Sequence, residues 1–120
     1  MWNTKNQRQD AIKTYGDIKY WDVSVVTNMH YLFSYTQYFN DDISNWNTSQ
    51  VTDMSKMFYN VKAFNQLIGL WDTSQVTDMS KMFYRAISFN KPIELWKTYK
   101  VTRMGNMFNR AISFNRQIKS

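Results

Sequence analysis

The chain repeats itself every 25 residues, and this period constrains its fold more than any other feature. From Trp21 onward the sequence divides into four units at residues 21–45, 46–70, 71–95 and 96–120, with no insertion or deletion between them. One such unit cannot bury its own apolar side, so a period of this length indicates units that stack on one another. We therefore expect a single domain over residues 1–120, built as a repeat stack.

Equivalent positions in the four units form columns of identical or similar residues. Each unit begins with Trp, continues with Val-Thr, Met and a Met-Phe or Leu-Phe pair, and closes with Phe-Asn and Ile. The apolar columns predict one continuous core, with Phe58, Phe83 and Phe108 buried in line. The Trp column is interpreted as a stacked ladder inside that core, in preference to an exposed platform for sugars or bases.

Within a unit the apolar spacing changes from helix-like to strand-like. The residues spaced three to four apart in the second unit are Val51, Met54, Met57, Phe58 and Val61. This spacing predicts a short helix of about two to three turns, with Ser49 or Thr52 at its start and Asp53 at its positive end. A short parallel strand is predicted around Ile68. The expected fold class is an α/β repeat, with one short strand and one short helix in each 25-residue coil.

Two polar columns are predicted to bond from coil to coil. An Asn follows the second Phe of every unit, and a Thr follows every Val. A buried amide must make its hydrogen bonds, so we expect an inward Asn ladder that bonds the neighbouring turn backbones. The Thr hydroxyls are expected to do the same.

The two ends of the array differ. Residues 1–20 resemble half a unit, because Ile18 falls in the Ile column whereas Arg8 stands where the first Phe should be. Polar residues in core positions are typical of a capping repeat. The unit at 96–120 keeps the full apolar set, so we expect its outer side to be an open edge that binds a partner.

Charge is distributed unevenly along the chain. Residues 1–60 carry five basic and six acidic groups, whereas residues 61–120 carry ten basic and three acidic groups. The sequence therefore predicts a partner-binding surface for a protein with an acidic surface, with solubility as the alternative explanation. Nucleic acid is less favoured, because no groove-reading helix is evident. The candidate residues are Lys91, Lys97, Lys100, Arg103, Arg110, Arg116, Lys119, Phe114 and Ile118.

No constellation for catalysis is evident in the sequence. There is no Cys, and the only histidine is His30, at a position held by Ser in the next two units. Nucleophilic catalysis needs an activating base beside the nucleophile, and no such pair stands out. Asp41 and Asp42 form an acidic pair in a variable column, which indicates solvated surface. We expect no enzyme activity, no catalytic residue, no cofactor and no metal. No segment is long and apolar enough to span a membrane.

The repeat pattern W-D-x-S-x-V-T-D-M-S-x-M-F…F-N-x-x-I resembles the BspA-type leucine-rich-repeat surface proteins, which include mycoplasma surface lipoproteins. Residues 71–90, WDTSQVTDMSKMFYRAISFN, match it almost throughout. The resemblance implies a right-handed leucine-rich-repeat-like solenoid on a cell surface, adhesive or protein-binding and without catalytic residues. The sequence departs from the family in showing no export or lipid signal. Its last unit also carries Lys97, Tyr99 and Arg103 where Asp, Ser and Asp are usual.

Two functions of different classes follow from these observations. The first is a non-catalytic interaction module that docks through its basic C-terminal end. The second is a structural or assembly component of a larger particle such as a virion, and nucleic-acid binding ranks third. The resemblance implies the cell surface or the extracellular space. A chain that truly starts at Met1 would instead be expected in a virion or the cytoplasm.

Overall fold

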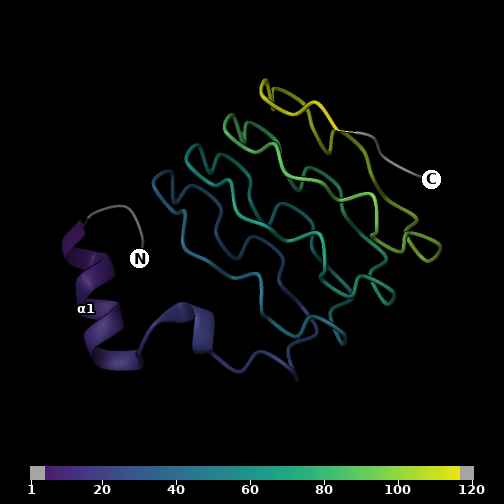
Figure 1. Ribbon diagram of the computed structural model, residues 1–120. Helices are drawn as coiled ribbons and strands as arrows, with labels where there is room; N and C mark the ends of the chain where they lie inside the picture. Colours follow the sequence, from purple (N-terminus) through teal and green to yellow (C-terminus); the bar gives the residue numbers. More distant parts are fainter. Residues whose placement is uncertain (1–4, 117–120) are drawn as a thin grey trace.

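The computed structural model describes residues 5–116. Its helices are α1 (Lys5–Tyr15) and the short 3-10 helix η1 (Ile18–Tyr20), both ahead of the first full repeat (Figure 1). From residue 21 to residue 116 the chain forms turns and irregular backbone, with isolated parallel bridges but no helix and no extended strand. No helix among the described residues has the length and apolar character needed to cross a membrane.

The repeats lie side by side in sequence order (Figure 1). We call them coil 1 (21–45), coil 2 (46–70), coil 3 (71–95) and coil 4 (96–116, as far as described). At each junction, alternate backbone N–H groups of one coil donate to carbonyls of the next, 24 residues further on. Between coils 2 and 3 these bonds run from Met54 to Asp78, Lys56 to Ser80, Phe58 to Met82 and Asn60 to Tyr84, at 2.8–3.0 Å. The constant 25-residue period therefore keeps the backbone hydrogen bonds between neighbouring coils in register.

The predicted helix in each coil is wrong, and the α/β leucine-rich-repeat-like solenoid is wrong with it. Met57 N–H donates to Met54 O and Val61 N–H to Phe58 O, so these segments are four-residue β-turns. The third residue of each turn has a left-handed backbone, with φ of 56° at Lys56 and 61° at Asn60. A right-handed helix cannot contain such residues. Successive turns of this kind place apolar residues three to four positions apart on the same side of the chain. They also leave every second backbone N–H group available to donate to the next coil.

The predicted strand around Ile68 is also wrong. The Ile68 carbonyl, in coil 2, accepts the backbone N–H of Trp71 at the start of coil 3 and the indole N–H of Trp96 at the start of coil 4. It is therefore not available for a parallel ladder. The parallel bridges lie instead in the Asn28, Asp53, Asp78 and Arg103 column, one residue per coil. Asp53 thus sits in a bridge between coils, whereas the sequence placed it at a helix end.

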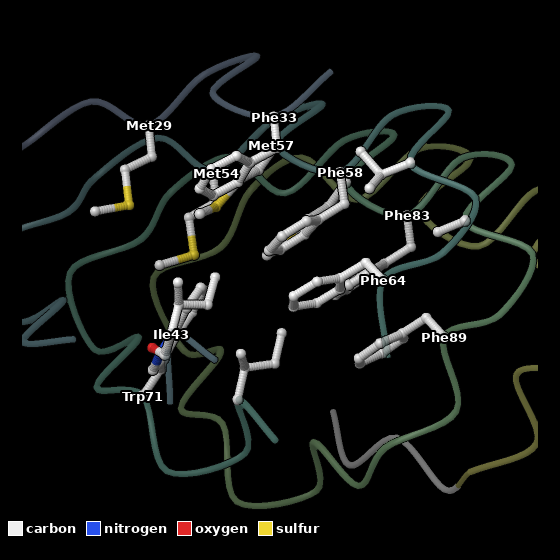
Figure 2. Close-up of a cluster of buried hydrophobic side chains, with 14 of the residues drawn as sticks. Met29, Phe33, Ile43, Met54, Met57, Phe58, Phe64, Trp71, Phe83 and Phe89 are labelled. Carbon is white, nitrogen blue, oxygen red and sulfur yellow. The ribbon is translucent and has the colours of Figure 1, made fainter. Parts of the chain in front are cut away.

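The apolar columns form the continuous core that the sequence predicted (Figure 2). Phe58 and Phe83 are fully buried, and successive rings of the column from Phe33 to Phe108 stack with centroids 5.8, 5.5 and 5.4 Å apart. Phe108 lies in line but is only partly buried. The Trp column is a core ladder from coil 2 onward, with the indoles of Trp46 and Trp71 stacked at 6.4 Å.

Both polar columns bond between coils as expected, although the Asn side chains do not point inward. The side-chain oxygen of Asn40 accepts the backbone N–H of Asn65, and Asn65 and Asn90 continue the series at 2.9 and 3.0 Å. Asn40 is nevertheless exposed, so the ladder runs along the surface. The Thr52 hydroxyl donates to Thr27 O in the preceding coil.

Residues 5–20 lie against coil 1. Ile18 is buried in the Ile column, and its carbonyl accepts the indole N–H of Trp46 at 2.9 Å. This is the bond that Trp71 makes to Ile43 one coil further on. In α1, Ala11 is buried and Arg8 forms an ion pair with Asp41 at 2.7 Å. The half-unit therefore keeps the Ile position of a coil and replaces the rest with a helix.

Replacing Gly69 by Ala is expected to destabilise the stack, because coils 2 and 3 approach each other closely at this glycine. A Cβ atom at Gly69 would lie 2.5 Å from the backbone oxygen of Pro92. We expect a loss of about 1–3 kcal/mol in the free energy of unfolding, measured by urea denaturation. Gly105→Ala is the matched control, since a Cβ there meets nothing within 4 Å. Equal effects of the two substitutions would contradict the close approach.

Candidate functional site

The outer side of coil 4 exposes core positions that are covered in the other coils. We call this surface the end face. Met104 is 40% exposed, whereas Met54 and Met79 in the same column are fully buried. Phe108 and Phe114 are partly buried and stack on each other at 4.1 Å. The end face is therefore an apolar surface shaped like an internal junction of the stack.

Backbone donors line the same end face. In coil 3 the N–H groups of Met79, Lys81, Phe83 and Arg85 donate to carbonyls of coil 4 at 2.8–3.0 Å. The equivalent N–H groups of coil 4 belong to Met104, Asn106, Phe108 and Arg110, and they have no backbone acceptor within residues 5–116. Such a row of donors is a template for an incoming extended segment.

The basic residues predicted from the sequence are spread over the surface of coil 4 and are not gathered in one patch. Lys97, Lys100, Arg103, Arg110 and Arg116 are all exposed, and each occupies a different column of coil 4. The Lys100 ammonium donates to the Gln75 side chain, and the Arg116 guanidinium donates to Asn90 O. Lys91, in coil 3, is partly exposed. Ile118 and Lys119 lie outside the described residues.

A second surface runs along one side of the stack, and we call it the side groove. It is an open groove of about 490 Å³ that crosses all four coils. Its cationic lining residues are Lys62, Arg85 and Arg110, and its apolar ones are Tyr35, Ile87 and Ile112. Only Arg110 was among the sequence candidates. Lys62 and Arg85 were missed, although the paired arginines at positions 85 and 110 of one column could have indicated Arg85.

A tyrosine ladder borders the side groove. The rings of Tyr59 and Tyr84 stack with centroids 4.8 Å apart, and Tyr35 lies 5.5 Å from Tyr59. The Arg85 guanidinium lies 5.9 Å from the centre of the Tyr84 ring. The pKa of Tyr59 is raised, first because its neighbours reduce its hydration and second because of the Tyr35 phenol. Tyr59 therefore adds no negative charge beside the cations of the groove at physiological pH.

One cluster combines the residue types of a hydrolytic triad without its geometry. The Ser55 hydroxyl donates to Asp53 at 2.6 Å, and the Nδ1 atom of His30 lies beside the same hydroxyl. In a working triad the histidine sits between the acid and the nucleophile and takes the serine proton. Here Ser55 occupies the middle and donates its hydrogen bond to Asp53. Within residues 5–116 no group of three or more His, Cys, Asp or Glu side chains could hold a metal ion.

Comparison with known proteins gives one result. Residues 2–120 match the family described as Mycoplasma protein of unknown function, DUF285. The chain belongs to the DUF285 family. No curated protein and no solved structure matches it.

The DUF285 match covers nearly the entire chain, from the residues ahead of α1 to coil 4. It supports the resemblance that the repeat pattern indicated, but only as membership of a family and not as a surface location or a binding role. Its description assigns no activity, ligand or site. The function of this DUF285 protein must therefore be argued from its two exposed surfaces.

Proposed function

We propose that this protein is a non-catalytic repeat module that binds another protein through its end face. The single observation that carries the proposal is the pairing of an exposed apolar centre with a row of backbone donors. Met104 is the most exposed core residue of coil 4, and the N–H groups of Met104, Asn106, Phe108 and Arg110 have no backbone acceptor within residues 5–116. An extended segment of a partner would supply carbonyls to these donors and apolar side chains to the centre.

The charges around the end face select the chemistry of that partner. Lys97, Lys100 and Arg103 are exposed on coil 4, and none of them forms an ion pair within residues 5–116. A partner with an acidic rim around an apolar segment would be attracted to this surface, and two such basic ends would repel each other. The resemblance of the repeat to BspA-type surface proteins also supports a binding or adhesive role.

The first expected result concerns the free protein. Amide hydrogens of Met104, Asn106, Phe108 and Arg110 should exchange much faster than those of Met79, Lys81, Phe83 and Arg85, which are bonded to the next coil. Sedimentation across protein concentration and salt, combined with hydrogen exchange, measures both association and protection. A monomer with fully protected amides in coil 4 would contradict an open end face.

The partner test uses a charge-reversed variant of the same protein. Changing Lys97, Lys100 and Arg103 together to Glu should weaken binding to a captured partner and flatten its salt dependence. Lys13, Lys19 and Lys81 changed together to Glu form the matched control, since these lysines lie on α1, η1 and coil 3. Protection of the coil 4 amides in the complex identifies the surface. A partner that leaves those amides unprotected would overturn the proposal.

A further inference from the structure

We propose that the side groove is a second binding site, and that it takes an extended acidic peptide segment that carries apolar side chains. The site extends well beyond the end face, because it runs along the coils and includes residues of coils 1, 2 and 3, although Arg110 belongs to both surfaces. It therefore goes beyond the proposed function and can succeed or fail independently of it.

The cations of the groove are not neutralised by the protein itself. The ion pairs within residues 5–116 are Arg8 with Asp41 and the contact of His30 with Asp53, and neither involves the groove. No Asp or Glu lines it, whereas Lys62, Arg85 and Arg110 do. Arg85 and Arg110 occupy the same column of neighbouring coils. Like charges held this close favour an anionic ligand that lies across both.

The groove side chains extend from turns whose backbone is held by hydrogen bonds between coils. Tyr35, Asn60, Arg85 and Arg110 occupy one column, and each has a left-handed backbone with φ between 57° and 65°. The N–H groups of Tyr35, Asn60 and Arg85 donate to carbonyls of the following coil at 2.8–2.9 Å. Because these turns are fixed by the stack, binding orders side chains only, which lowers its entropic cost.

The apolar lining decides which class of anion fits. Ile112 is 81% exposed and Tyr35 is 60% exposed, so exposed apolar side chains line the groove together with the cations. Single-stranded nucleic acid binds through open aromatic faces. The faces of Tyr59 and Tyr84 are stacked against each other, and an isoleucine offers no ring face to a base or a sugar. A peptide with both acidic and apolar side chains matches cations and isoleucines together, while the side-chain amide of Asn60 can bond its backbone.

The test uses a fluorescein-labelled peptide of about six residues in which glutamate alternates with leucine, because four coils stacked about 5 Å apart span the length of roughly five to six extended residues. Fluorescence anisotropy should show binding that weakens with salt. Changing Lys62, Arg85 and Arg110 together to Gln should weaken binding about tenfold, and Ile112→Ser should weaken it further. The matched control changes Lys13, Lys19 and Lys81 together to Gln, which removes the same charge elsewhere.

Three results would overturn the proposal. The first is equal affinity of the groove variant and the control variant, which would reduce the effect to net charge. The second is equally tight binding of a glutamine-for-glutamate peptide. The third is preferential binding of an oligouridylate or a heparin fragment, which would assign the groove to another polyanion. Thermal unfolding of each variant shows whether it remains folded, and the exposed Ile112→Ser variant tests the groove without altering its charges. Met104→Glu, on the end face, should leave peptide binding unchanged.

Discussion

Truncation of Phe83 to Ala is expected to lower the free energy of unfolding by about 3–5 kcal/mol. The ring is fully buried and contacts aromatic rings in its own coil and in both neighbouring coils. Its centroid lies 5.5 Å from Phe58, 5.4 Å from Phe108 and 4.3 Å from Phe89. The surrounding coils are held by backbone hydrogen bonds and cannot collapse into the cavity, so the loss should be near the upper end of this range.

The control for Phe83 lies two residues away. Lys81→Ala should cost less than about 0.5 kcal/mol, apart from any effect of its left-handed backbone. Urea denaturation followed by tryptophan fluorescence measures both variants. Phe108→Ala, in the same column on the end face, should cost less than Phe83→Ala because its ring is only partly buried. Similar losses for all three would contradict the aromatic column as the core of the stack.

Truncation of Trp71 to Ala is expected to have a comparable effect, about 3–5 kcal/mol. Trp71 is 3% exposed, and its indole N–H donates to the backbone carbonyl of Ile43 at 3.0 Å. Trp71→Phe separates the two contributions. It retains most of the apolar contact but leaves a buried carbonyl with one bond fewer, which we expect to cost about 1–3 kcal/mol.

The matched variant is Trp21→Phe, in the same column at the start of coil 1. The Trp21 indole donates to the carbonyls of Tyr15 and Gly16, and both bonds are exposed. Water can replace the indole at these carbonyls, so the loss should be well below that of Trp71→Phe. Thermal unfolding of the two variants gives the comparison. A larger loss at Trp21 would show that the buried indole bonds do not hold the coils together.

The end face was predictable from the sequence, whereas the side groove was not. Coil 4 keeps Met104, Phe108 and Phe114 in core columns, and the repeat register therefore identified the apolar residues that no further coil covers within residues 5–116. The side groove combines Lys62 with Arg85 and Arg110, which lie in three different coils. The sequence shows an excess of basic residues in residues 61–120. This excess does not indicate on which side of a coil each cation lies.

By itself, the sequence determined the period, the columns and most of the buried residues. Apolar residues that recur every 25 positions are removed from water when the repeats stack on one another. The sequence did not determine the backbone path within a coil. Met54, Met57 and Val61 have the spacing of a helix face, and successive turns place them on the same side equally well. The left-handed residues that exclude the helix include Tyr35, Lys56 and Arg85, and none of them is a glycine that would have marked a turn. Only the stack decided between the two conformations. Bonding alternate N–H groups to the next coil joins all four repeats, whereas a helix would use those donors within one coil.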